Sequence, residues 1–197
     1  AQLTSTVGQP GEHGPATALA VLAALDAVGG DLAAAGLALA DLGGLKGRGE
    51  RLRVPVGGGE ALLIDESYNA NPASMAATLK VLGEEEVEGR RVAVLGAMRE
   101  LGEETAGFHA ALAEPVRAAG VDLAILVGKE MEALASALGT GMKVAHVPDA
   151  AAAMKVARET IGPGDAVLVK GSNSIGLAAL VEALAGDRPA GFGTDKD

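Results

Sequence analysis

Short apolar runs alternate with stretches of helical periodicity along most of the chain. The runs lie at residues 52–56, 61–64, 91–95, 123–127, 144–147 and 166–169. After each of the last five runs, apolar residues recur every three or four positions, as at Met75, Leu79 and Leu82. Continuous apolar strands that alternate with helices are typical of a parallel sheet covered on both faces. The sequence therefore predicts an α/β fold.

The first 46 residues follow a different pattern. Three elements are predicted there, a strand at 3–7 and helices at 15–28 and 32–42, the second helix with Asp31 as its N-cap. A charged, glycine-rich segment from Lys46 to Arg51 follows, and we expect the boundary between two domains there. Because two helices and one strand cannot enclose a core, we expect residues 1–46 to pack against something that the chain lacks.

Composition and charge narrow the classes of function. Hydrophobic residues make up 49% of the chain but aromatic residues only 2%, so the core must be aliphatic. The net charge of −10 opposes binding to nucleic acid or to an anionic membrane surface. The absence of cysteine excludes disulfides and thiolate metal sites and suits a cytoplasmic protein. The chain begins at Ala1 without a signal-peptide pattern, which suggests a cut inside a longer protein.

The stretch from Leu62 to Met75 carries the densest candidate chemistry. Asp65 and Glu66 end an apolar run, a polar turn follows, and Asn71-Pro72 has the pattern of an N-cap followed by proline at the first helical position. Ligands bind outside the carboxyl ends of parallel strands, where helix N-termini present free N–H groups. The bland alternative is a well-capped turn with solvated acids.

Three more polar turns follow predicted strands, at 96–102, 128–130 and 170–174. In a parallel sheet they share one edge with the turn after residue 66. Lys170 and the two serines that follow it suit a carboxylate or phosphate ligand, although Lys170 is equally explained as a surface lysine. His109 and His146 are expected to have packing or surface roles.

Several common motifs of nucleotide and hydrolase chemistry are absent from the sequence. Gly128-Lys129 is followed by Glu130 and does not complete a phosphate loop, and Gly47-Arg48-Gly49 does not complete a dinucleotide fingerprint. No two histidines have metal-ligand spacing, and no nucleophile elbow is found. A Ser-His-Asp arrangement built by the fold stays open.

Five partial motifs, taken in order, resemble those of the Mur ligase family and span residues 11–185. They are Gly11-Glu12-His13, Lys46-Gly47-Arg48-Gly49-Glu50, Asp65-Glu66-Ser67-Tyr68-Asn69-Ala70-Asn71-Pro72 with Ser74-Met75, Val94-Leu95-Gly96-Ala97-Met98-Arg99-Glu100-Leu101-Gly102, and Val169-Lys170-Gly171-Ser172. The third motif is similar to the turn of the branch that adds D-alanyl-D-alanine.

This resemblance implies a fold and a reaction. Residues 47–197 would be the Rossmann-like parallel-sheet C-terminal domain of a Mur ligase, and residues 1–46 the end of the central ATP-binding domain. The intact enzyme would be an ATP-dependent amide ligase that joins D-alanyl-D-alanine to UDP-N-acetylmuramoyl-tripeptide in peptidoglycan synthesis. ATP and Mg²⁺ would be held mainly by missing upstream domains. The chain alone, without a phosphate loop or a catalytic residue, is expected not to turn over.

The resemblance also implies two sets of site residues and a hinge at Arg48. The nucleotide set is Arg48, Asp65, Glu66, Tyr68, Asn69, Asn71 and His13, with Glu66 matching the ribose-binding acid more closely than Asp65. The substrate set, for the acceptor dipeptide, is Lys170, Ser172, Asn173, Gly96 and Met98. No metal ligand is implied within the chain.

The chain departs from the family pattern at several positions. Ala97 replaces an acid and Asn173 an arginine in the expected acceptor pocket, and Gly14 and Thr17 replace asparagines at the expected adenine contacts. Two alternatives stay open. One is a related Mur or folylpolyglutamate-synthetase-like ligase, and the other is a non-catalytic flavodoxin-like binding module.

Overall fold

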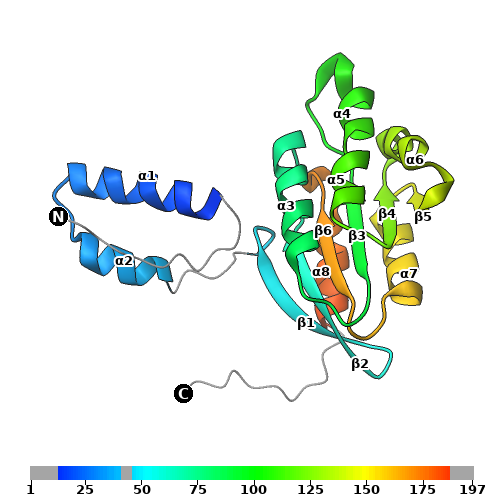
Figure 1. The fold of residues 1–197 in the computed structure, drawn as a ribbon, viewed down its shortest axis with the longest axis horizontal. Helices are drawn as coiled ribbons and strands as arrows, with labels where there is room; N and C mark the ends of the chain where they lie inside the picture. The colour runs from blue at the N-terminus through cyan, green and yellow to red at the C-terminus, as the bar shows by residue number, and fades with distance from the viewer. Residues whose placement is uncertain (1–12, 41–45, 187–197) are drawn as a thin grey trace.

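A six-stranded sheet forms the centre of the larger part of the structure (Figure 1). The computed structural model describes residues 13–40 and 46–186. The strands are β1 (Glu50–Val56), β2 (Gly59–Glu66), β3 (Arg91–Gly96), β4 (Leu123–Val127), β5 (Lys143–Val147) and β6 (Ala166–Lys170). They lie in the order β1-β2-β6-β3-β4-β5. The strands β2, β6, β3, β4 and β5 run parallel, and β1 pairs antiparallel with β2. The predicted α/β fold is confirmed, with an antiparallel strand added at one edge.

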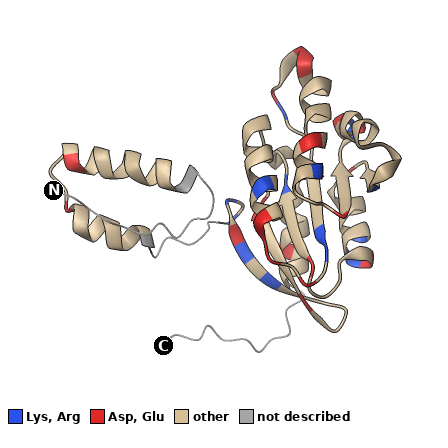
Figure 2. Cartoon of the chain, in the orientation of Figure 1, with Lys and Arg blue, Asp and Glu red and all other residues tan. Residues whose placement is uncertain are grey.

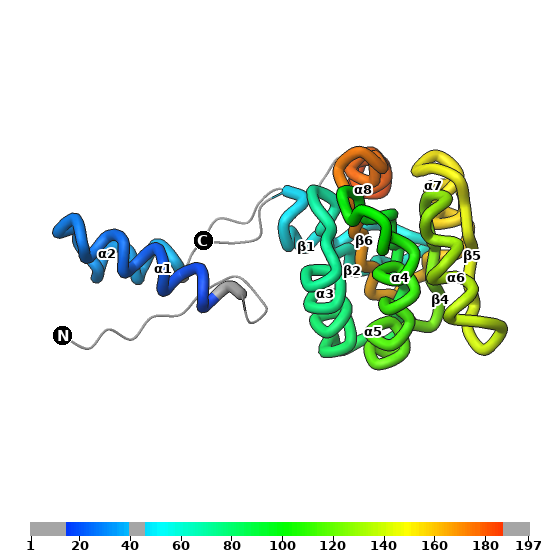
Figure 3. The backbone as a smooth tube through the Cα atoms, turned by 90° about the horizontal axis from the view of Figure 1, so that it is seen from above, coloured from blue at the N-terminus to red at the C-terminus, as the bar shows by residue number. Residues whose placement is uncertain are grey.

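Helices cover both faces of this sheet, as the view in Figure 3 shows. α3 (Pro72–Glu84), α5 (Ala113–Ala118) and α6 (Glu132–Leu138) pack on one face, where α4 (Thr105–Ala111) precedes α5, and α7 (Ala150–Thr160) and α8 (Leu177–Gly186) pack on the other. Each interface is a core of aliphatic side chains and methionines, with Leu79, Leu95 and Leu168 fully buried in the first. Burial on both sides explains why the central strands are apolar throughout.

Two helices, α1 (His13–Ala27) and α2 (Leu32–Ala40), pack against each other and stand apart from the sheet in Figure 1. Asp31 caps α2 as predicted, because its Oδ1 accepts hydrogen bonds from the backbone N–H groups of Ala33 and Ala34. Leu19 of α1 is 67% exposed and Leu37 of α2 is 74% exposed, so this pair of helices buries little of its apolar surface. The predicted strand at 3–7 and the tail from 187 lie outside the described residues.

Charged residues of both signs are spread over the sheet-containing part of the molecule (Figure 2). β1 itself carries Glu50, Arg51 and Arg53 on the open edge of the sheet. Charge on an edge strand disfavours pairing with another chain. Within residues 13–40 and 46–186, none of the helices is both long and apolar enough to cross a membrane.

Candidate functional site

The carboxyl ends of the parallel strands bring the predicted turns to one edge of the sheet. Glu66 at the end of β2 pairs with Lys170 at the end of β6, and Lys170 pairs in turn with Leu95 of β3. Gly96 then pairs with Val127 of β4. The turns that follow these strands are therefore neighbours, which confirms their predicted placement.

Lys170 is buried at the centre of this edge. Its Nζ donates a hydrogen bond to the backbone carbonyl oxygen of Asn69 at 2.9 Å, and it lies 3.5 Å from Oε2 of Glu66. Burial lowers the pKa of Lys170, and the charge of Glu66 opposes that shift. Only 3% of the lysine side chain is exposed, so the structure does not favour the predicted grip of Lys170 on a substrate carboxylate.

Asp65 is also buried, with 1% of its surface exposed. Its Oδ2 accepts a hydrogen bond from the N–H of Gly47 at 2.8 Å, and its Oδ1 accepts one from the N–H of Ser67 at 3.0 Å. Its backbone oxygen accepts a third hydrogen bond from Gly49. Because both carboxylate oxygens already bind backbone groups, the geometry favours a structural role for Asp65 over the predicted contact with a nucleotide.

The segment that Asp65 holds carries an exposed pair of side chains. The guanidinium carbon of Arg48 lies 4.2 Å from the centre of the Tyr68 ring, which is 50% exposed. The N–H of Tyr68 donates to the carbonyl of Gly47, and Gly47 has a φ of +74°. A Cβ on Gly47 would lie 2.9 Å from the Cβ of Tyr68, so only glycine allows this close approach. Arg48 and Tyr68 thus form a fixed cation–π pair at the surface.

The residues from Ser67 to Asn71, here called the β2 turn, end at the N-terminus of α3. The side chain of Asn71 accepts a hydrogen bond from the N–H of Ser74, whose hydroxyl accepts one from the N–H of Asn71. This is a capping box, and Pro72 occupies the first helical position, as predicted. Asn69 is exposed, and its Oδ1 accepts a hydrogen bond from Ala70. Asn71 therefore serves the helix as well as facing solvent.

On the other side of Lys170, the turns after β3 and β6 pack backbone against backbone. A Cβ on Gly171 would lie 2.9 Å from the Cα of Gly96. Ser172 links the two turns, since its N–H donates to Ala97 and its Oγ accepts from the N–H of Arg99. Gly96 is buried and serves packing, so contact of its α-carbon with a substrate is not favoured.

Met98 likewise points inward. Its side chain is 1% exposed and belongs to the core, and its N–H donates to Nε2 of His109 at 2.9 Å. His109 is fully buried, which selects packing from the two roles left open by the sequence, and its Nδ1 lies 2.7 Å from the carbonyl of Thr105. Nε2 therefore accepts from Met98, and Nδ1 is placed to donate to Thr105. The predicted role of the Met98 side chain in binding a substrate is therefore not favoured.

An ion pair between Arg99 and Glu130 bridges the turns after β3 and β4 at the same edge. A hydrogen bond from its own backbone N–H, together with Arg99, holds the pKa of Glu130 below its usual value. Asn173 is exposed beside Ser172. Arg99 and Asn173 are exposed and Glu130 is partly exposed, so these three polar groups are accessible at this end.

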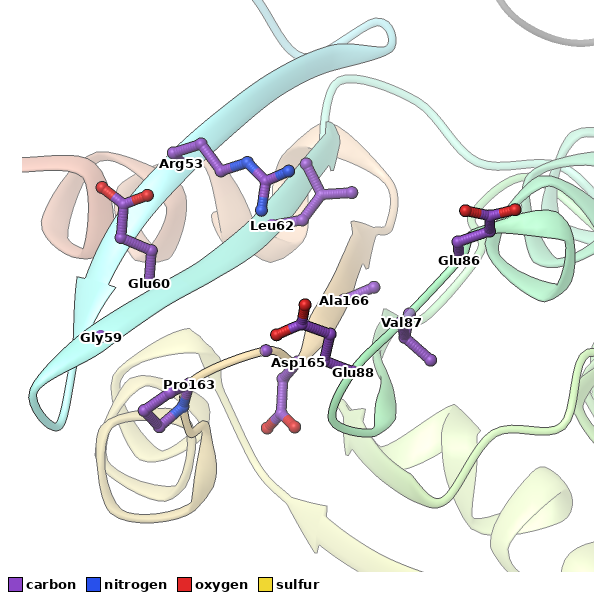
Figure 4. Close-up of a pocket in the computed structure, with 11 residues that line it drawn as sticks. Arg53, Gly59, Glu60, Leu62, Glu86, Val87, Glu88, Pro163, Asp165 and Ala166 are labelled. Carbon is purple, nitrogen blue, oxygen red and sulfur yellow. The ribbon is translucent and has the colours of Figure 1, made fainter.

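A pocket that the sequence did not predict lies at the opposite end of the strands. Figure 4 shows its lining residues, with Arg53 beside Leu62, Glu60 on the β1–β2 hairpin, and Glu88 near Asp165 and Ala166. His146 is exposed on β5, with its Nε2 2.8 Å from the carbonyl of Gly128. The side chain of His13 lies outside what the structure describes. In the ranges 13–40 and 46–186, no group of three or more His, Asp or Glu is placed to hold a metal ion.

Comparison with known proteins decides the family. The family model described as "Mur ligase, glutamate ligase domain" matches residues 47–173. The chain belongs to the Mur ligase family. It is 39% identical over 177 residues to the UDP-N-acetylmuramoyl-tripeptide--D-alanyl-D-alanine ligase of Escherichia coli strain K12, covering 89% of this chain and 37% of that protein. It is 33% identical over 199 residues to the ligase of the same name from Mycobacterium leprae, covering 92% of this chain and 38% of the relative.

A crystal structure of a Mur ligase, MurF from Acinetobacter baumannii, has the same fold. It superposes with a TM-score of 0.79 at 26% identity, over 92% of this chain and 40% of that one. The chain therefore spans somewhat over a third of the length of these Mur ligases.

Sequence reasoning missed the roles of Arg99, Glu130 and the buried His109. Their contacts join residues that are 11 to 73 positions apart, and no local pattern reports such pairs. The presence of Arg99 and Glu130 in neighbouring strand-end turns was the available signal, since opposite charges at one sheet edge can pair.

Proposed function

We propose that the chain is part of an ATP-dependent ligase that adds D-alanyl-D-alanine to UDP-N-acetylmuramoyl-tripeptide. Mur ligase family members are ATP-dependent ligases, and the relatives at 33–39% identity carry the name of this reaction. The observation that supports the proposal most is that Glu66 and Lys170, the last residues of β2 and β6, are register partners, so the β2 turn and the turn after β6 begin side by side. We call the edge formed by the carboxyl ends of the parallel strands the ligand edge. In this proposal it has a nucleotide side and an acceptor side.

The nucleotide side comprises Arg48, Glu66, Tyr68 and Asn69. The carboxylate of Glu66 is partly exposed and can accept hydrogen bonds from ribose hydroxyls, while the Arg48–Tyr68 pair presents a planar surface and a positive charge. Asp65 contributes by holding Gly47, which keeps Arg48 in place. When bound, ATP would supply the phosphoryl group that activates the carboxyl of the first substrate.

The acceptor side comprises Ser172 and Asn173, with Arg99 beside them. Hydroxyl, amide and guanidinium groups suit the carboxylate and peptide groups of a dipeptide. In this proposal residues 1–46 belong to the preceding ATP-binding domain, and residues 47–197 close over the nucleotide and exclude water from the reacting acyl phosphate. We keep the cytoplasm as the expected compartment, because the sequence has no cysteine to form disulfides.

The complete product of the gene tests this proposal by ADP release. We expect release only when ATP, UDP-N-acetylmuramoyl-tripeptide and D-alanyl-D-alanine are all present. A single amino acid that replaces the dipeptide equally well would assign the protein to another Mur ligase reaction. For the 197-residue chain alone we expect no ADP release, and turnover by this chain would contradict the division of labour proposed here.

A further inference from the structure

We propose that Lys170 is a positioning residue that holds the β2 turn in the shape that binds the nucleotide, and that it does not grip the acceptor. This inference rests on the proposed ligase function for its role in catalysis. Its structural part, that Lys170 sets the conformation of the β2 turn, stands on the described contacts alone.

The first argument is access. The lysine side chain is 3% exposed, its Nζ donates to the Asn69 carbonyl at 2.9 Å, and the Glu66 carboxylate lies 3.5 Å away. A carboxylate from a substrate would have to enter a buried space and displace an acceptor that is already there. Desolvating a second anion beside Glu66 is also costly. The ammonium group of Lys170 is therefore already engaged by groups of the protein itself.

The second argument is what the lysine holds. Within the β2 turn, Asp65 binds the N–H of Ser67, and the N–H of Tyr68 binds the carbonyl of Gly47. Lys170 binds the carbonyl of Asn69. The first two contacts fix the turn to its own strand and to the segment before β1, whereas Lys170 ties the turn to β6. Because Glu66 and Lys170 are register partners, the sheet fixes the position of the lysine backbone relative to the start of the β2 turn.

The consequence is a link between the two sides of the ligand edge. Lys170 holds the Glu66 carboxylate and the turn that carries Tyr68, and the residues after it, Gly171 and Ser172, contact the turn after β3. Loss of the ammonium group would release the Asn69 carbonyl and leave Glu66 without its cation. The nucleotide side should then lose its arrangement while the acceptor side keeps its own hydrogen bonds.

Tyr68 provides a direct probe, because it is the sole tyrosine of a sequence with no tryptophan. In the 197-residue chain we compare Lys170→Met with Lys129→Met, which removes an exposed cation at the end of β4. For Lys170→Met we expect increased acrylamide quenching of tyrosine fluorescence and amide hydrogen exchange at Ala70 and Asn71 about tenfold faster. For Lys129→Met we expect neither change. A folded Lys170→Met chain that behaves like the parent would overturn the positioning role.

A measurement on the unmodified chain covers the case in which Lys170→Met does not fold. NMR of lysine labelled with nitrogen-15 should show one slowly exchanging ammonium group with scalar coupling to the carbonyl carbon of Asn69. Ammonium signals that all exchange as fast as exposed lysines would overturn the inference.

The catalytic part is tested in the complete gene product. We expect Lys170→Met to raise the KM for ATP about tenfold and to leave the KM for D-alanyl-D-alanine within about twofold. The reverse pattern would return Lys170 to the acceptor and overturn the inference. If the unmodified enzyme released no ADP with these substrates, the proposed function would fail, while the fluorescence and exchange results would still decide the structural part.

Discussion

Oδ2 of Asp65 accepts the N–H of Gly47 at 2.8 Å, across 18 residues of sequence. This contact binds the segment before β1 to the end of β2, and it places Arg48 over Tyr68. The buried carboxylate of Asp65 thus binds backbone groups within the protein, whereas the neighbouring Glu66 side chain is partly exposed at the ligand edge.

Asp65→Asn should destabilise the chain and loosen the Arg48–Tyr68 pair. The substitution leaves one oxygen where two backbone N–H groups are bound, and an unsatisfied buried group costs about 1–3 kcal/mol. Urea unfolding measures the free energy, and tyrosine quenching reports on the pair. Glu103→Gln, at an exposed position, is the control and should change neither. Unchanged stability of Asp65→Asn would remove the structural role assigned to Asp65.

His109→Leu should cost about 1–3 kcal/mol, because it removes the acceptor for the buried N–H of Met98. Hydrogen exchange at Met98 should also become faster. His146→Leu removes an exposed ring, and we expect a loss of less than about 1 kcal/mol. Equal unfolding free energies for the two variants would contradict the account of the turn after β3.

Gly171→Ala and Gly107→Ala should change the free energy of unfolding in opposite directions. A Cβ at Gly171 would meet the Cα of Gly96 at 2.9 Å and push two turns apart, a loss of about 1–3 kcal/mol. Gly107 lies within α4, and a Cβ there meets nothing within 4 Å, so alanine should gain about 0.5–1 kcal/mol. The midpoints of urea unfolding distinguish the two, and a stabilised Gly171→Ala chain would refute the tight packing.

Asp165 should make stability depend on pH. Burial by itself would raise the pKa of Asp165, but hydrogen bonds from Arg90 and from the N–H of Gly162 outweigh it and hold the pKa below the ordinary 3.8. A carboxylate whose pKa is lowered by folding stabilises the protein fully above its unfolded-state pKa. This stabilisation is lost as pH falls through the folded-state pKa.

For Asp165→Asn we therefore expect a loss of about 1–3 kcal/mol at pH 7 that shrinks steadily below pH about 4. Urea unfolding across that range gives the difference from the parent chain. A difference that stayed constant down to pH 2 would show that packing, and not the charge, is responsible.

The sequence was sufficient for the strands of the sheet, for the start of α3 and for the edge at which the turns meet. Continuous aliphatic runs placed β2 to β6 within a few residues, and Asn71-Pro72 correctly marked the start of α3. These features follow from backbone periodicity and from capping, which are local properties.

The division of labour within the site could not be predicted in the same way. Asp65 and Glu66 are adjacent and chemically alike, yet the first is buried and the second partly exposed. Lys170 and Asn69 are 101 residues apart, and only the pairing of β2 with β6 brings them together. Which polar group a fold uses internally depends on such distant contacts, which residue spacing does not encode.

The central claim is that the β2 turn is the nucleotide side of a ligase site, and the KM for ATP of Glu66→Gln in the complete gene product tests it most directly. The variant keeps the size of the side chain and removes the charge that would accept from the ribose hydroxyls. The account predicts a KM for ATP about tenfold higher, with the KM for D-alanyl-D-alanine within about twofold and with Glu100→Gln unchanged. An unaltered KM for ATP in Glu66→Gln would contradict it.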